Sequence, residues 1–313
     1  MNHDQNRRTG DPGARPKKFQ SPDPPSGHLS EPFAARGAEV RAILKEQDFR
    51  FEKKWGQNFL TDANLLEAVV RDSGTGPEDL AVEVGAGAGA LTLALSRAAG
   101  QVVAFEIDQR LRTVLARTLE GRANVTLRFE DVLKADLSDL SDPSRPFRLV
   151  ANLPYYITTP VVMRFLEGGF PLKSLTVMVQ KEVAERFAAG PEDPNYGAVS
   201  AVLAFYGIPR ICRTVSRNLF IPRPEVDSAL FHLDCVRRFF PRDEALFFRT
   251  VKAAFAMRRK TLVNNLAALG LDKAEAADLL KALGFSEQVR GEKLSPADFV
   301  RLSDALSERG IKG

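Results

Sequence analysis

Short apolar runs alternate with segments of helical periodicity along the first two thirds of the chain, and this alternation constrains the fold more than any other feature. Successive runs are about 20–30 residues apart, the length of a strand–helix–strand crossover. Such units stack on a mainly parallel sheet. The predicted strands are Leu80–Val84, Val102–Ile107, Val125–Phe129, Phe147–Ala151 and Leu175–Val179, and the predicted helices are Asp62–Ser73, Ala90–Ala98, Gln109–Leu119 and Thr159–Glu167.

The pattern changes near Cys235. Ala229–Leu233 follows a proline-rich loop and is predicted to add to the sheet edge as an antiparallel strand. Beyond it the pattern is only helical, with predicted helices Arg242–Met257, Arg259–Leu269, Lys273–Gly284 and Ser295–Ser307. We therefore predict an α/β fold with a Rossmann-like sheet over residues 38–235 and a small all-α domain over residues 236–313.

The first 37 residues have a different composition. They are rich in Pro, Gly, Ser and Arg and have almost no apolar periodicity. A segment of this kind cannot bury enough surface to offset its chain entropy. We predict a disordered tail over residues 1–37, in a chain of 313 residues whose length suits about two domains.

Composition excludes several other classes of protein. Cys212 and Cys235 have no CxxC spacing and the chain has only three His, so we expect neither a metal site nor a disulfide framework. No segment approaches the ~20 uninterrupted apolar residues of a membrane helix. The N-terminus also lacks the apolar core of a signal peptide. We expect a cytoplasmic protein with no membrane partner.

A glycine-rich turn joins the first predicted strand to the next helix, in the run Glu83–Thr92. Gly85 and Gly87 would let a nucleotide-like cofactor lie against the backbone. Glu106 closes the second predicted strand, where a carboxylate can accept hydrogen bonds from both hydroxyls of a ribose. Asp131 follows the third strand and is placed to accept from an adenine amino group.

This turn leaves other interpretations open. Its sequence also matches the pattern G-x-G-x-x-A, so a dinucleotide-binding oxidoreductase is an alternative interpretation. A glycine turn with no cofactor is the third possibility, and Glu106 and Asp131 argue against it.

The fourth strand ends in Asn152-Leu153-Pro154-Tyr155 and favours one of these cofactor chemistries. Hydride transfer does not need this tetrapeptide, whereas methyl transfer to a nucleobase amine does. The lone pair of that amine is delocalised into the ring, so the nitrogen is a poor nucleophile. The Asn152 side-chain oxygen and the Leu153 carbonyl would accept the two N–H bonds and aim the lone pair. Pro154 would fix the turn, and Tyr155 would stack on the base.

Together these motifs resemble the ribosomal RNA adenine dimethyltransferase family over about residues 40–305. The resemblance is carried by Gln57–Leu60, Gly85–Gly89, Glu106, Asp131, Asn152–Tyr155, Val179–Ala184, Pro224–Ala229 and Arg258–Leu266. The last motif and the helical domain resemble the branch that dimethylates two adjacent adenines near the 3′ end of small-subunit (16S) rRNA. Two positions depart from the family pattern: Ala86 stands where Pro is usual, which is expected to loosen the turn, and Val263 where a basic residue is common.

The resemblance implies roles for particular residues. Those expected to contact S-adenosylmethionine or its surroundings are Asn58, Leu60, Gly85, Glu106, Asp131 and Asn152. Phe220 is expected to form the second aromatic wall around the target adenine, although a phenylalanine packed in the core beside Ile221 is an equally good interpretation.

Positive charge is concentrated in one stretch. Between Arg237 and Lys260 there are eight basic and two acidic residues, although the whole chain carries only +4. Basic stretches attract phosphates, and we expect Arg258, Arg259 and Lys260 to contact RNA.

The resemblance thus implies an S-adenosylmethionine-dependent dimethylase of 16S rRNA that acts in ribosome biogenesis. Its catalytic domain would span residues 38–235 and its RNA-docking domain residues 236–313. The expected partner is the small ribosomal subunit, and we expect a monomer. The alternatives are a large-subunit rRNA dimethylase of the antibiotic-resistance type, or a non-catalytic ribosome-assembly or transcription factor on the same fold.

Overall fold

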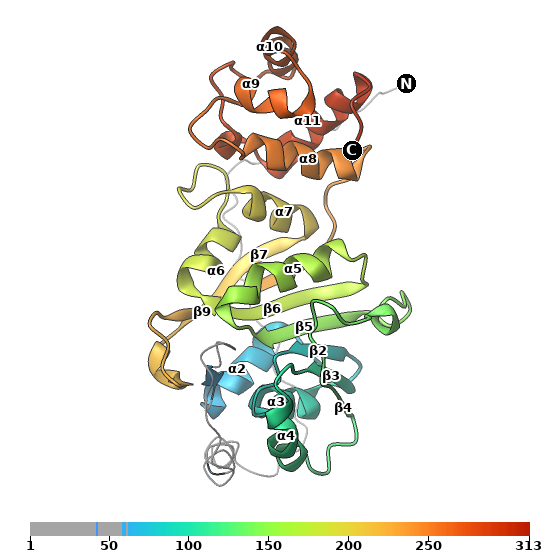
Figure 1. Ribbon diagram of the computed structural model, residues 1–313, viewed down its shortest axis with the longest axis vertical. Helices are drawn as coiled ribbons and strands as arrows, with labels where there is room; N and C mark the ends of the chain where they lie inside the picture. The colour runs from blue at the N-terminus through green and yellow to red at the C-terminus, as the bar shows by residue number, and fades with distance from the viewer. Residues whose placement is uncertain (1–41, 43–57, 61) are drawn as a thin grey trace, which may run out of the picture. The chain divides into compact units, whose positions relative to one another are not determined.

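The computed structural model describes residue 42, residues 58–60 and residues 62–313 (Figure 1). All of the described residues belong to a single compact unit. The tail predicted over residues 1–37 lies outside the described residues.

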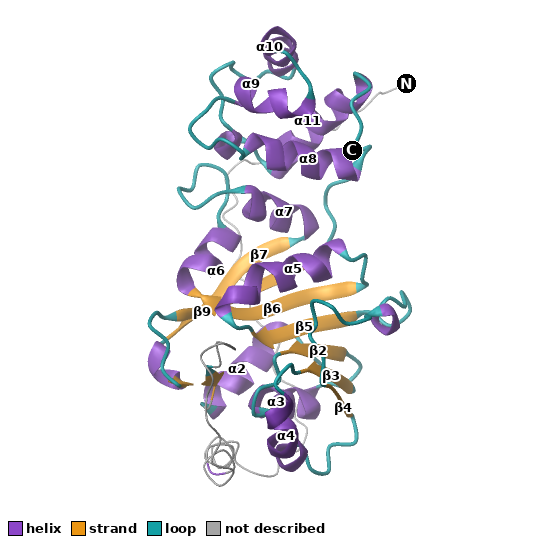
Figure 2. Cartoon of the chain, in the orientation of Figure 1, coloured by secondary structure: helices purple, strands orange, loops and turns teal. Residues whose placement is uncertain are grey.

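A seven-stranded sheet forms the centre of the α/β part (Figure 2). Its strands, in spatial order, are β4 (Val125–Arg128), β3 (Gln101–Phe105), β2 (Leu80–Val84), β5 (Phe147–Asn152), β6 (Leu172–Gln180), β9 (Ser228–Asp234) and β7 (Ile208–Val215). The first five are mutually parallel, and β9 is antiparallel to both of its neighbours. The predicted Rossmann-like α/β fold is confirmed.

Side chains of the central strands alternate between two apolar clusters, one on each face of the sheet. In β5, Val150 belongs to one cluster, whereas Leu149 and Ala151 belong to the other. The first face is covered by α2 (Ala63–Ser73), α3 (Ala90–Ala98) and α4 (Arg112–Thr118), and the second by α5 (Thr158–Glu167) and α6 (Lys181–Ala188). Strands that are buried on both faces are continuous apolar runs in sequence, which is why the pattern predicted them well.

The structure corrects the prediction at the antiparallel end of the sheet. The strand predicted as Ala229–Leu233 is β9, and it pairs with β6 on one side and β7 on the other, so it is interior. The edge strand is β7, which the sequence analysis missed. Most of its side chains are at least partly exposed, and it contains Pro209 and a bulge between Ile211 and Arg213, so it has no apolar run.

Two short strands form a separate antiparallel pair. They are β1 (Phe59–Leu60) and β8 (Phe220–Ile221), and Leu60 lies opposite Phe220. This pair joins the segment before α2 to the loop before β9, two regions that are far apart in the chain.

The helical part comprises α8 (Glu244–Ala254), α9 (Leu262–Asn265), a 3-10 turn over Leu266–Leu269, α10 (Lys273–Ala282) and α11 (Pro296–Glu308). Ser295 caps α11, because its hydroxyl accepts from Asp298 N at 3.2 Å while Asp298 Oδ2 accepts from Ser295 N at 3.0 Å. The apolar core of this part also includes residues of α7 (Ala198–Tyr206), where the rings of Phe205 and Phe247 stack at 4.4 Å. Helices α6 and α7 were not predicted.

The helices around the basic cluster are shorter than predicted. Helix α8 ends at Ala254 and α9 begins at Leu262, so Arg258–Lys260 lie in the intervening loop and not on a helix. Asn265 on α9 connects the two sides of this loop, because its Nδ2 atom donates to the carbonyl of Ala254 at the end of α8 at 2.8 Å.

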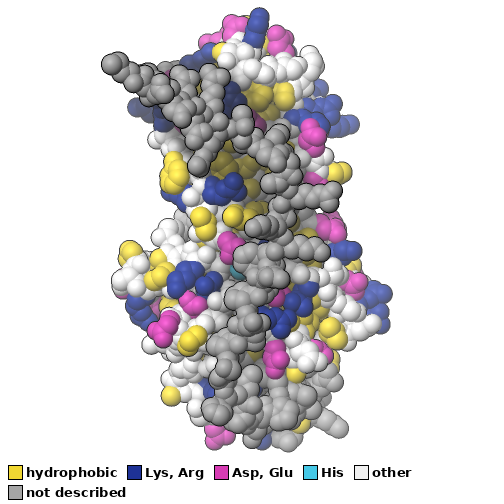
Figure 3. Space-filling model, turned by 180° about the vertical axis from the view of Figure 1, so that it is seen from behind, with side chains coloured by type: hydrophobic (Ala, Val, Ile, Leu, Met, Phe, Trp, Pro, Cys, Tyr) yellow, Lys and Arg dark blue, Asp and Glu magenta, His cyan; other side chains and the backbone are white. Residues whose placement is uncertain are grey.

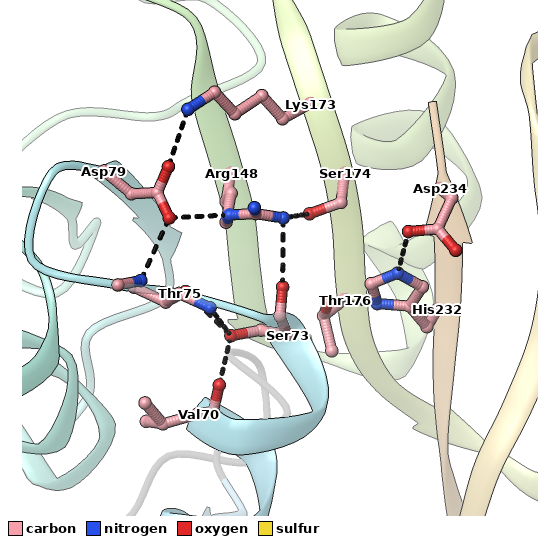
Figure 4. A network of polar contacts seen from close by, with 11 residues as sticks. Val70, Ser73, Thr75, Asp79, Arg148, Lys173, Ser174, Thr176, His232 and Asp234 are labelled. Carbon is pink, nitrogen blue, oxygen red and sulfur yellow. Dashed lines mark hydrogen bonds and ion pairs between the residues drawn. The ribbon is translucent and has the colours of Figure 1, made fainter. Parts of the chain in front are cut away.

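A polar network closes the edge of the sheet where the parallel strands begin (Figure 4). Asp79 accepts from Arg148 Nε at 2.9 Å and from Lys173 Nζ at 2.7 Å, and Arg148 also donates to Ser174 Oγ at 3.0 Å. Burial alone would raise the pKa of Asp79, but the hydrogen bonds from Lys173 and Arg148 hold it below its usual range. This network ties the starts of β2, β5 and β6 together and leaves their opposite ends for a ligand.

Candidate active site

A cavity of about 300 Å³ opens at the carboxyl ends of the parallel strands, where the strand order changes direction between β2 and β5. Open α/β sheets bind ligands at this point. All the residues predicted for the cofactor and the target base line it except Phe220: Asn58, Leu60, Gly85, Gly87, Glu106, Asp131, Asn152, Leu153, Pro154 and Tyr155. The structure thus brings together residues from five separate segments of the chain.

The glycine turn forms one wall of the cavity. Gly85 has φ +79° and Gly87 has φ +57°, a backbone region that residues with a Cβ rarely adopt. A Cβ on Gly87 would lie 3.0 Å from Cε1 of Phe59. The backbone N–H groups of Gly85 and Ala86 both donate to the carbonyl of Phe105, at 2.8 and 3.0 Å. Proline could not donate the second of these bonds, so Ala86 contributes a contact that offsets the expected loosening of the turn.

Glu106 connects the end of β3 to the glycine turn. Its carboxylate accepts from Gly87 N at 2.7 Å through Oε2 and from Asp108 N at 2.8 Å through Oε1. Burial raises its pKa, and the two backbone hydrogen bonds act against that rise. The side chain is only 6% exposed, and each oxygen retains a second lone pair for a ligand hydroxyl.

Asp131 lies beyond the carboxyl end of β4, at a more open position in the same cavity. Its Oδ1 atom accepts from Leu133 N at 3.0 Å, and Lys134 Nζ lies 3.6 Å from Oδ2. Its carboxylate therefore lines the cavity in a position fixed by the local turn.

Glu83 is a candidate site residue to which the sequence analysis gave no role. It is buried in β2 and lines the cavity, and its Oε2 atom has no hydrogen-bond partner among the described residues. Burial raises its pKa from 4.5 to about 8, with the charge of Glu106 as a smaller contribution. A glutamate inside an otherwise apolar strand was the feature that could have identified it.

Glu83→Gln is expected to change how stability depends on pH. The unfolded carboxyl loses its proton near pH 4.5 and the folded one near pH 8, so the folded protein loses stability as pH rises between these values. Relative to the parent, the variant should be more stable at pH 8 than at pH 5 by about 3 kcal/mol. Urea unfolding of both proteins at the two pH values measures this, and parallel pH profiles would contradict it.

Asn152 is oriented by a contact across the fold. Its Nδ2 atom donates to the backbone carbonyl of Asn58 at 2.8 Å, which leaves Oδ1 as an acceptor. Leu153 is buried, and its backbone N–H donates to Met178 O at 3.3 Å. An acceptor oxygen at this strand end is what the predicted contact with a nucleobase amine requires.

Tyr155 is held from the opposite side. Its hydroxyl lies 3.0 Å from Ser228 Oγ on β9, and burial raises its pKa. The side chain is half-buried and lines the cavity, so part of it remains available to a base.

Phe220 does not line the cavity. It is 3% exposed and lies on β8 within the apolar cluster that also contains Phe59 and Val215. The proposed stacking on adenine stays a prediction, and this burial favours the alternative of a core phenylalanine.

Phe220→Ala distinguishes the two roles. Its burial leads us to expect a loss of about 3–5 kcal/mol in the free energy of unfolding. A stacking role would instead lower the methylation rate roughly ten- to a hundredfold with the melting temperature unchanged. Thermal unfolding and single-turnover methylation should be compared with Phe240→Ala, which removes a phenylalanine that is 71% exposed.

The comparisons with known proteins agree with this geometry. A sequence model described as ribosomal RNA adenine dimethylase matches residues 48–308. The chain belongs to this family. As a ribosomal RNA adenine dimethylase it is an enzyme, and its methyl donor is S-adenosylmethionine. Family membership decides against the dinucleotide-binding oxidoreductase.

Individual members of the dimethylase family are similar over most of their length. The ribosomal RNA small subunit methyltransferase A of Streptococcus pneumoniae serotype 2 (strain D39 / NCTC 7466) is 45% identical over 284 residues, which cover 87% of this chain and 97% of that protein. The crystal structure of a dimethyladenosine transferase from Plasmodium falciparum has a TM-score of 0.72 at 24% identity, covering 81% of this chain and 98% of that one. The crystal structure of the 23S rRNA methyltransferase ErmE has a TM-score of 0.63 at 26% identity, and the match covers 80% of this chain and 100% of that one.

The basic residues of this dimethylase are not equally available to RNA. Arg258 lies 3.7 Å from Glu292 and also donates to the carbonyl of Pro194. Arg259 and Lys260 are exposed and have no ion-pair partner in the part of the chain that the structure describes. Figure 3 shows one face of the molecule, on which Lys and Arg side chains alternate with Asp and Glu. Arg259 and Lys260 are therefore the strongest candidates for phosphate contacts.

Arg259→Ala combined with Lys260→Ala is expected to weaken RNA binding and to leave cofactor affinity unchanged. Each lost phosphate contact should reduce the slope of log K against log salt concentration by up to about one unit. RNA binding measured over a series of salt concentrations tests this, with Arg258→Ala as a separate variant because that residue also holds the loop. Identical slopes for variant and parent would assign both side chains to a solvated surface.

Proposed function

We propose that this dimethylase transfers methyl groups from S-adenosylmethionine to the N6 amino groups of two adjacent adenines near the 3′ end of small-subunit (16S) rRNA. The observation that carries the proposal is the position of Asn152–Tyr155 in the same cavity as the glycine turn, Glu106 and Asp131. The 45% identity with small-subunit methyltransferases supports the choice of subunit, against 26% with the 23S enzyme.

The residues of the cavity fit the cofactor. Gly85 and Gly87 present backbone without a side chain along one wall of the cavity, and Glu106 and Asp131 place carboxylates in the same cavity, where they would accept from ribose hydroxyls and an adenine amine. The Glu83 carboxyl is a further polar group of the cavity, and because burial raises its pKa to about 8 it is mainly protonated and neutral near pH 7. S-adenosylmethionine, when bound, supplies an electrophilic methyl group on a positively charged sulfur.

Asn152 and Leu153 act on the target amine. The contact with Asn58 fixes the Asn152 amide so that Oδ1 accepts one N–H bond, and the Leu153 carbonyl accepts the other. Positive charge that develops on the nitrogen is stabilised by these two oxygens, and the lone pair is directed at the methyl group. Pro154 holds the turn, and Tyr155 stacks on the base that has left its helix.

No side chain is assigned as a general base. The amine nitrogen becomes strongly acidic once it is methylated, so water can take its proton. The chain contributes positioning and charge stabilisation, which must operate twice on each adenine.

Incubating the enzyme with labelled S-adenosylmethionine and isolated small or large ribosomal subunits tests the substrate. We expect label in the small subunit, in dimethyladenosine near the 3′ end of its rRNA. Label only in the large subunit would support the resistance-type alternative. Binding to the subunits without label in either of them would contradict the proposed function.

The same proposal assigns different functions to two parts of the chain. Residues 38–235 would bind the cofactor and carry out catalysis, and residues 236–313 would dock the RNA. The protein would act as a monomer in the cytoplasm. In the described part of the chain, no helix is long and apolar enough to cross a membrane.

A further inference from the structure

Tyr156 is a large aromatic side chain that remains open at the cavity. It follows Tyr155 in the 3-10 turn Tyr155–Ile157, lines the cavity and is 57% exposed. Exposed apolar side chains inside a concave site are typical of binding surfaces. The Tyr156 ring would therefore lose contact with water when a ligand enters the cavity.

The two neighbouring tyrosines lie near different parts of the site. Tyr155 reaches Ser228 on β9, the strand beyond β6. Tyr156 instead lines the same cavity as Glu106 and Asp131, the carboxylates that follow β3 and β4. Burial raises the pKa of Tyr156, and the charges of Asp131 and Glu106 raise it further. One turn thus carries one ring that contacts the antiparallel strand β9 and a second ring that lines the cavity together with the two carboxylates.

The position of Tyr156 places its ring near the adenosine half of the cofactor in the proposed function. In the proposed function Glu106 receives the ribose hydroxyls and Asp131 the adenine amine, so an aromatic ring near both lies beside the adenosine half. Ile107, which directly follows Glu106, lines the same cavity and is 38% exposed. Both apolar side chains would lose water contact when a purine enters.

We propose that Tyr156 is a cofactor-binding residue that covers the adenosine half of S-adenosylmethionine and sets its affinity, an inference that rests on the proposed function. A purine contacts an aromatic ring through its face and edge, and such contacts are sequence-tolerant and apolar. The ring contributes through area, and its hydroxyl is not required. The target adenine is held by Asn152–Tyr155 and does not depend on Tyr156.

Calorimetric binding of S-adenosylhomocysteine and of 5′-methylthioadenosine tests this inference. The second compound lacks the amino-acid portion, so it reports on contacts with the adenosine half alone. Tyr156→Ala should raise the Kd of both compounds by the same factor, about five- to twentyfold. Tyr156→Phe should stay within twofold of the parent, and the KM for RNA should not change in either variant.

Phe240→Ala is the matched control, because it removes an exposed aromatic ring that does not line the cavity. It should leave both Kd values unchanged. Tyr156→Ala with parental affinity for both compounds and a raised KM for RNA would overturn the inference and assign the ring to the target base. A parent protein that binds neither compound would instead overturn the proposed function, so the two failures are distinguishable.

Discussion

Asn152→Ala should lower the rate of adenine methylation by about a hundred- to a thousandfold at saturating S-adenosylmethionine. The variant removes the Oδ1 acceptor that stabilises charge on the amine nitrogen, and losing one such preorganised group typically costs this much. It also removes the 2.8 Å bond to Asn58 O, so the segment before α2 loses one anchor. Single-turnover methylation of small subunits, with cofactor affinity measured in parallel, tests the expectation.

Asn152→Asp separates the two functions of the side chain. It keeps an acceptor oxygen but cannot donate to Asn58 O, so we expect an activity between that of Asn152→Ala and that of the parent. Asn195→Ala, an exposed asparagine in the loop before α7, is the control and should be fully active. An Asn152→Ala rate within tenfold of the parent would contradict the role of this amide in catalysis.

Glu106→Ala should weaken S-adenosylmethionine binding by about 1.5–3 kcal/mol, or roughly ten- to a hundredfold in Kd. The loss has two sources. Two charge-assisted bonds to the ribose disappear, and the N–H groups of Gly87 and Asp108 lose their acceptor, which loosens the glycine turn. The free energy of unfolding should therefore fall as well, by about 1–3 kcal/mol.

Calorimetry on the folded variant, with S-adenosylmethionine and with NAD, measures the effect. Glu120→Ala removes an exposed carboxylate after α4 and should change neither affinity nor stability. Unchanged cofactor affinity in Glu106→Ala, or tight binding of NAD by the parent, would contradict the assignment of this carboxylate to the ribose.

The interior of the fold was predictable because it depends on local pattern. Residues Leu80–Val84 form β2 over the predicted range, and Phe147–Ala151 needs only one more residue to complete β5. Both strands are buried on each face, so most positions select an apolar residue, with Glu83 in β2 and Arg148 and Asn152 in β5 as the exceptions. The apolar run is therefore visible without any knowledge of neighbouring strands. The residues of the site were also predictable from the sequence. Parallel strands place their carboxyl ends together, and Glu106, Asp131 and Asn152 each lie at or just beyond the end of one strand.

Elements at the periphery were not predictable in this way. The edge strand β7 has a proline, a bulge and exposed side chains, so it lacks both the apolar run and the alternation that identify strands. Helix α7 was missed although its residues are strongly apolar, because a short apolar run does not distinguish a strand from a buried helix. Two predicted helices, Arg242–Met257 and Arg259–Leu269, extended into the loop between α8 and α9, because Arg and Lys favour helices. In the structure Asn265 Nδ2 donates to the carbonyl of Ala254, the last residue of α8, and this contact depends on the fold.

The sequence by itself determined the α/β architecture, the glycine turn and the identity of the groups at the strand ends. Only the tertiary structure decided how those groups are oriented. Asn152 is oriented by a backbone carbonyl 94 residues away, Phe220 is buried in an apolar cluster with Phe59, and Tyr156 stays exposed in the cavity that Glu106 and Asp131 also line. Residue type and periodicity are local properties, whereas orientation and burial depend on contacts between segments that become neighbours only when the chain has folded.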